Sequence, residues 1–201
     1  LGLNRDKIPS AVAIGLIIWM SVQMIQGIVG FSLSGTIAIE PSWKIEGLAR
    51  FGLLIGMLFG TAVFEEIGFR GFLLAQFIRK LGRVVKNRAL LITIALLTSQ
   101  TFFTLMHIPW KVMNQGWTQA VFLDLLFSVF LNGVIYGLVY LRTKNLFFVI
   151  IIHALGNAPT DLIEPSIESP IIMLILVIVS CAMWTKITTV DVRGIDGGQA
   201  R

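Results

Sequence analysis

The stretch LARFGLLIGMLFGTAVFEEIGFRGFLLAQFI, residues 48–78, is apolar for most of its length and carries three charged residues in its second half, Glu65, Glu66 and Arg70. A membrane-spanning helix needs about 20 mostly apolar residues, because the hydrocarbon core of a bilayer is about 30 Å thick. This stretch is longer than an upright crossing requires, so we expect a helix that is tilted, broken or continued along the interface. It predicts a membrane helix with charges inside it or at its end.

The remainder of the chain supports a membrane protein. Of its 201 residues 56% are hydrophobic and 13% are charged, whereas soluble domains carry about 25% charged residues. These values exclude an ordinary soluble domain and a disordered chain. Further apolar runs occupy 10–31, 89–108, 118–141, 146–160 and 170–185. We therefore predict an all-α, polytopic membrane helix bundle with about six transmembrane helices, in which buried polar residues extend the short fifth run.

The distribution of charge predicts an orientation. Basic residues gather before the first run, between the second and third, between the fourth and fifth, and after the sixth: Arg5, Lys7, Arg79, Lys80, Arg83, Lys86, Arg88, Arg142, Lys144, Lys186 and Arg193. The connection between the fifth and sixth runs holds acidic residues and no Lys or Arg. By the positive-inside rule both termini are cytoplasmic. Loop charge explains the net charge of +5 without nucleic acid as a partner, and the basic loops suit anionic membrane lipids.

We expect three regions along the chain. Residues 1–47 form an N-terminal transmembrane helix and a loop, residues 48–185 form the functional core, and residues 186–201 form a disordered tail. The chain has one cysteine, Cys181, which excludes an internal disulfide framework and a cysteine-rich zinc site.

Placing a charged side chain inside a membrane span costs free energy, so such a side chain indicates a functional role. Glu66 and Arg70 are four residues apart, so on a helix they share a face and form an ion pair. Glu65 points about 100° away from Glu66 and has no partner in its own helix. An unpaired carboxylate in an apolar site is a candidate general base. The alternative is that the helix ends near residue 64 and both glutamates lie at the interface.

The only two histidines of the chain lie in or near predicted spans. Phe103 and His107 share a helical face at the end of the third run, and His153 and Asn157 share one in the fifth. The alternatives are a packed interfacial His107 and a hydrogen bond between helices at His153. A carboxylate can take a proton from water, and imidazole and carboxamide groups can orient that water, bind a metal or stabilise an oxyanion. Glu65, the two histidines and Asn157 together predict a hydrolytic site without a side-chain nucleophile.

Three segments in order, EEIGFRG (65–71), FTLMH (103–107) and HALGN (153–157), resemble the motifs of the CAAX-protease and bacteriocin-processing family of intramembrane proteases. Those motifs read E-E-x-x-x-R, F-x-x-x-H and H-x-x-x-N/D. The resemblance covers about residues 48–159. It implies an intramembrane endopeptidase that cleaves a membrane-associated or lipidated protein or peptide, in a multi-pass protein of the cell membrane, with the bacterial inner membrane as the expected location.

The resemblance also implies roles for individual residues. Glu65 would activate the water and His107 would assist it. His153 and Asn157 would stabilise the oxyanion. The supporting residues would be Glu66, Arg70 and Phe103.

Other interpretations stay open at this point. Glu65, His107 and His153 could hold a zinc ion with an open position, but a zinc-bound Glu65 could not also be a free base, so we expect no metal cofactor. A non-proteolytic membrane immunity or chaperone-like factor of the same family would need no catalysis. A small transporter with a proton relay is a third possibility, although no inverted repeat supports it.

Overall fold

The computed structural model describes residues 2–158 and 160–187, with side chains placed as far as Trp184. Within this part every regular element is helical, apart from one isolated bridge between Ile39 and Ile163. The predicted all-α fold is therefore confirmed. The elements in chain order are the 3₁₀ turn η1 (Arg5–Lys7), α1 (Ile8–Ser34), α2 (Ser42–Glu46), α3 (Ala49–Gly56), the π-helical η2 (Met57–Thr61), α4 (Ala62–Glu66), the π-helical η3 (Ile67–Leu73), α5 (Leu74–Leu81), α6 (Arg88–Gln115), α7 (Gln119–Asp124), the π-helical η4 (Leu125–Leu131), α8 (Asn132–Thr143), α9 (Leu146–Asn157) and α10 (Ser169–Ile187).

Long apolar helices dominate the described part of the chain. Four are long and apolar enough to cross a membrane: Arg5–Ser34, Ala49–Leu81, Arg88–Gln115 and Gln119–Thr143. Shorter apolar helices cover Leu146–Asn157 and Ser169–Trp184. Each predicted run has its counterpart among these helices, while the number of six crossings and the cytoplasmic termini stay predictions. Helix α10 continues to Ile187, and the rest of the predicted tail lies outside the described residues.

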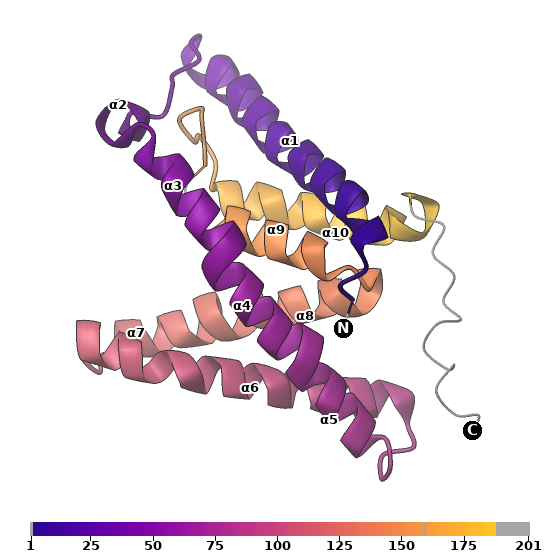
Figure 1. Cartoon of the computed structure of the whole chain (residues 1–201). Helices are drawn as coiled ribbons and strands as arrows, with labels where there is room; N and C mark the ends of the chain where they lie inside the picture. The colour runs from indigo at the N-terminus through magenta and orange to yellow at the C-terminus, as the bar shows by residue number, and fades with distance from the viewer. Residues whose placement is uncertain (1, 159, 188–201) are drawn as a thin grey trace.

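The helices form two groups on either side of one long helix (Figure 1). The continuous helix α3–α5 runs diagonally through the molecule, with the antiparallel pair α6 and α7–α8 at one end and the group α1, α9 and α10 at the other. Helix α9 contacts α1, α4 and α8, and α6 contacts α5 and α8. The second and fifth apolar runs therefore meet at the centre of the bundle, where α4 lies against α9.

Helix α9 is short because of the residues at its two ends. Asn145 begins it by accepting a hydrogen bond from the Phe148 backbone N–H. Ala158, which precedes Pro159 in the sequence, has extended backbone angles, as expected for a residue before proline. Seven of the twelve residues between these ends are buried. A helix of this length rises about 18 Å, so α9 does not cross a 30 Å core by its own length, and the fifth run forms a buried central helix.

Two helices are longer or less regular than the sequence predicted. The second run is unbroken from Ala49 to Leu81, but π-helical turns occur on both sides of α4, which carries the two glutamates. Such turns hold an extra residue and are frequent at functional sites. Helix α6 continues past Pro109 to Gln115, so the predicted end of the third run at residue 108 was wrong and His107 lies inside the helix.

Two glycines of α8, Gly133 and Gly137, lie against α6. A Cβ at Gly133 would overlap the side-chain amide of Gln100, and a Cβ at Gly137 would overlap Leu96. Gln100 is buried and bonded, because its Nε2 donates to the Val129 carbonyl at 3.1 Å. Glycine at position 133 is therefore required for the close approach of α6 and α8.

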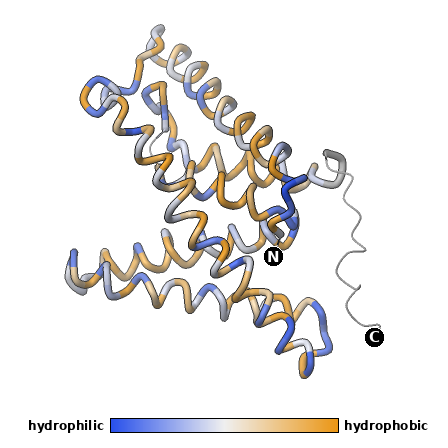
Figure 2. Tube along the Cα trace, viewed as in Figure 1, coloured by the Kyte–Doolittle hydropathy of each residue, from blue (hydrophilic) through white to orange (hydrophobic). Residues whose placement is uncertain are grey.

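Hydrophilic residues gather at the turns, while the lengths of the helices are mostly hydrophobic (Figure 2). The Lys7 ammonium donates to the Lys144 carbonyl at 2.7 Å, which ties the start of α1 to the α8–α9 turn. Burial lowers the pKa of Lys144, and the nearby charges of Arg88 and Lys7 lower this pKa further. Basic groups from three segments thus meet at one end of the bundle.

Replacing Gly133 with alanine is expected to destabilise the protein. The added methyl displaces a buried glutamine that has its own hydrogen bonds, and overpacking of this kind costs about 1–3 kcal/mol. Thermal unfolding of the purified protein in detergent measures the change. Gly52→Ala is the matched control, because a Cβ at Gly52 meets nothing within 4 Å. Equal midpoints for the two variants would contradict this role for Gly133.

Candidate active site

The site is built around a fully buried carboxylate, that of Glu66 (0% exposed). Its Oε1 accepts a hydrogen bond from Arg70 Nη1 at 3.0 Å and from His153 Nδ1 at 2.7 Å. The predicted pair between Glu66 and Arg70 is therefore present, and the histidine of α9 joins it. One oxygen atom connects α4, η3 and α9.

The guanidinium of Arg70 extends this connection to two more helices. Its Nη2 donates to Gln100 Oε1 of α6 at 3.1 Å and to the Gly133 carbonyl of α8 at 2.9 Å. Its plane also lies over the ring of Phe103, with 4.8 Å between Cζ and the ring centroid. Arg70 therefore contacts three other segments of the bundle, α4, α6 and α8, and only a planar, multi-donor side chain can make these contacts together.

Glu65 faces a different direction from Glu66, toward both imidazoles. Its Oε1 lies 3.6 Å from His107 Nε2 and its Oε2 lies 3.7 Å from His153 Nε2. The side chains of Glu65 and His107 are partly exposed, whereas that of His153 is buried. The structure thus brings together three of the predicted site residues from α4, α6 and α9.

The hydrogen bonds of the two histidines define which ring nitrogen faces Glu65. His107 Nδ1 lies 2.8 Å from the Phe103 carbonyl, which can only accept, so this nitrogen carries the proton. His153 Nδ1 donates in the same way to the Glu66 carboxylate. In both rings Nε2 therefore points at the Glu65 carboxylate, and the space between them suits a molecule that both donates and accepts, such as water.

Aromatic rings fix the planes of both imidazoles. Tyr136 of α8 stacks on His153 with 4.7 Å between centroids and 25° between planes. Phe103 lies 4.5 Å from His107, and Phe69 meets Phe103 edge to face. The support by Phe103 was predicted from the sequence motifs, whereas the support by Tyr136 was not.

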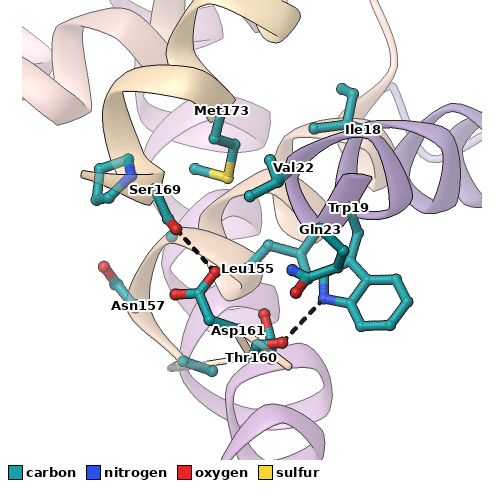
Figure 3. A pocket seen from close by; sticks show the side chains of 13 residues that line it. Ile18, Trp19, Val22, Gln23, Leu155, Asn157, Thr160, Asp161, Ser169 and Met173 are labelled. Carbon is teal, nitrogen blue, oxygen red and sulfur yellow. Dashed lines mark hydrogen bonds between the residues drawn. The ribbon is translucent and has the colours of Figure 1, made fainter. Parts of the chain in front are cut away.

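Asn157, the fourth residue of the predicted catalytic set, lies apart from these three. It is exposed at the last position of α9, about 6 Å along the helix axis from His153. We find no hydrogen bond from its side chain to any described residue. Instead it lines a cavity of about 270 Å³ between α1, the end of α9 and the start of α10 (Figure 3).

Gln100 and Tyr136 are the two polar residues near the site that the sequence analysis missed. Both lie in predicted spans, where a buried polar side chain is itself a signal. Their spacing gives no hint of a partner, because their contacts with Arg70 and His153 come from distant parts of the chain. Among the described residues, no group of three or more His, Cys, Asp or Glu is arranged to hold a metal ion.

The fold and the site together define a class: a multi-pass membrane protein with a carboxylate and two imidazoles enclosed among its helices. Residues 47–159 match the model of the type II CAAX prenyl endopeptidase Rce1-like family. This is more than half of the chain, and the protein belongs to this family. The resemblance that three short motifs predicted is confirmed, and with it the class of membrane peptidases. No curated protein and no solved structure matches the chain.

Replacing Glu66 with glutamine is expected to destabilise the fold strongly. The glutamine has nearly the same shape, but the charge of Arg70 then stays buried without its counter-ion, which costs about 3–5 kcal/mol. Chemical unfolding in detergent measures the loss. Glu164→Gln is the control, because Glu164 is exposed in the loop before α10, and an exposed charge contributes at most about 1 kcal/mol. Similar losses in the two variants would contradict a central role for Glu66.

Proposed function

We propose that this protein is an intramembrane endopeptidase that hydrolyses a peptide bond with a water molecule activated by Glu65. The observation that carries the proposal is the position of the Glu65 carboxylate between two Nε2 atoms whose rings are fixed by hydrogen bonds to Nδ1. A base held in this way is oriented for proton transfer before the substrate arrives. Family membership supports the reaction class.

The reaction proceeds in two steps. A water molecule between Glu65 and His107 gives a proton to the carboxylate while its oxygen bonds to the carbonyl carbon of the substrate. The π electrons of the carbonyl move to its oxygen, and the oxyanion accepts a hydrogen bond from His153, whose imidazolium form donates from Nε2 while Nδ1 stays bonded to Glu66. The oxyanion then re-forms the carbonyl as the carbon–nitrogen bond breaks, and Glu65 gives its proton to the leaving nitrogen. Asn157 provides a second hydrogen bond when the substrate lies across the end of α9.

The proposed substrate is a membrane-associated or lipidated protein or peptide. The site lies within the family match, among helices whose apolar side chains face outward, which supports a substrate that enters from or beside the bilayer. We propose the bacterial inner membrane as the location.

A non-proteolytic immunity or chaperone-like role is not favoured, because it gives no reason for an ionisable group directed at two imidazoles inside a membrane.

Glutamine in place of Glu65 is expected to lower kcat/KM by about 100- to 10,000-fold, which is the usual contribution of a general base. The assay follows a farnesylated, internally quenched peptide with a Cys-aliphatic-aliphatic-X end, cleaved by the purified protein. Glu164→Gln serves as control, because Glu164 is exposed in the loop before α10. Unchanged activity of Glu65→Gln at unchanged folding would refute the proposal.

Chelation separates the metal-free mechanism from the zinc alternative at Glu65, His107 and His153. If Glu65 is a free base, we expect the activity to survive treatment with 1,10-phenanthroline followed by dialysis. Metal analysis of the treated protein verifies the removal. Activity that is lost on chelation and restored by added zinc would instead assign the three side chains as metal ligands.

A further inference from the structure

The cavity beside Asn157 has a mixed lining, of which the proposed reaction uses Asn157 alone. Figure 3 shows Trp19, Val22 and Gln23 of α1 on one side, Asp161 and Ser169 on the other, and Met173 of α10 between them. The apolar part of its wall comes from Ile18, Val22, Leu155 and Met173. The cavity therefore offers an apolar surface with a few polar groups, as ligand sites usually do.

Hydrogen bonds hold the polar side of the cavity in place. Gln23 Oε1 accepts from the Leu162 backbone N–H at 2.8 Å, and the Trp19 indole donates to the Thr160 carbonyl at 3.2 Å. Ser169 Oγ donates to Asp161 Oδ1 at 2.8 Å. The loop between α9 and α10 is thus fastened to α1, and the cavity is preformed.

One polar atom in this wall has no partner. Gln23 is 8% exposed, and its Nε2 donates to no acceptor among the described residues. A buried amide donor without an acceptor is costly, so the position favours a ligand with a carbonyl oxygen. Across the cavity, the partly exposed carboxylate of Asp161 favours a ligand with an N–H donor. A peptide backbone carries both groups beside an apolar side chain.

The position of the cavity relative to His153 indicates how many substrate residues separate the cavity from the cleaved bond. The part of α9 that lines it, residues 155–158, follows His153 by two to five residues, or about 3–8 Å of helix rise. An extended peptide advances about 3.3 Å per residue. A peptide whose cleaved bond lies at His153 therefore reaches the cavity about two residues away.

We propose that this cavity is a substrate subsite that holds an apolar residue about two positions from the cleaved bond, with its carbonyl on Gln23 and its N–H on Asp161. The inference rests on the proposed function, because it takes the bound peptide to be the substrate. It adds α1 and the loop before α10, which lie outside the family match, to the binding surface.

Binding to an inactive protein tests the subsite apart from catalysis. The probe is a fluorescein-labelled farnesylated peptide with a Cys-aliphatic-aliphatic-X end, and its fluorescence anisotropy with purified Glu65→Gln protein gives Kd. Gln23→Glu removes the donor but keeps the oxygen that accepts from Leu162, and Asp161→Asn removes the charge. Each change, added to Glu65→Gln, is expected to raise Kd about tenfold or more, as for lost hydrogen bonds to buried or charged groups.

Matched variants control for the fold. Glu164→Gln changes an exposed carboxylate of the same loop and is expected to leave Kd unchanged. Val22→Phe fills the cavity from α1, whereas Met24→Phe enlarges an exposed residue of the same helix, so only Val22→Phe is expected to weaken binding. Kd values within twofold of the parent for Gln23→Glu and Asp161→Asn would overturn the subsite, even if Val22→Phe weakens binding.

The two proposals fail in distinguishable ways. A wild-type protein that binds the peptide through Gln23 and Asp161 but does not cleave it would refute the peptidase and keep the site. A wild-type protein that cleaves the peptide while the variants bind normally would refute the subsite alone.

Discussion

The architecture depends on one buried negative charge. A carboxylate without contact to water is stable inside a protein only when opposite charge and hydrogen bonds surround it. Glu66 meets this condition at Oε1, which Arg70 and His153 both contact, whereas its buried Oε2 has no hydrogen-bond partner among the described residues. Arg70 also donates hydrogen bonds to Gln100 and to the Gly133 carbonyl. The groups that neutralise this single charge therefore link α4, α6, α8 and α9. The close approach of α6 and α8 at the glycines follows from the same requirement.

The different roles of Glu65 and Glu66 follow from helix geometry. Adjacent residues point about 100° apart, so when Glu66 faces the buried arginine, Glu65 must face elsewhere. The direction left to it contains His107 and His153. The ion pair of Glu66 with Arg70 thus fixes the rotation of α4 about its axis, so that Glu65 faces both imidazoles. His153 contacts Glu66 through Nδ1 and faces Glu65 through Nε2.

Local patterns in the sequence predict the helices and the pair of Glu66 with Arg70, because both depend on periodicity within one segment. They also separate Glu65 from Glu66. They do not predict that α6 continues past Pro109, nor that Asn157 lies beside a cavity instead of beside Glu65. Tyr136 and Gln100 were missed for the same reason: their roles come from contacts between helices distant in the sequence. Glu65, His107 and His153 lie on three helices that are distant in the sequence, and the crossing of α3–α5 over the bundle (Figure 1) brings them together.

The central claim is that Glu65 activates water and does not attack the substrate itself. A single turnover in water enriched in oxygen-18, with excess protein over peptide, tests this most directly by mass spectrometry of both partners. We predict one labelled oxygen in the new carboxylate of the first product and none in the Glu65 side chain. Label in the Glu65 carboxylate together with an unlabelled first product would show that Glu65 forms a covalent intermediate and would contradict this mechanism.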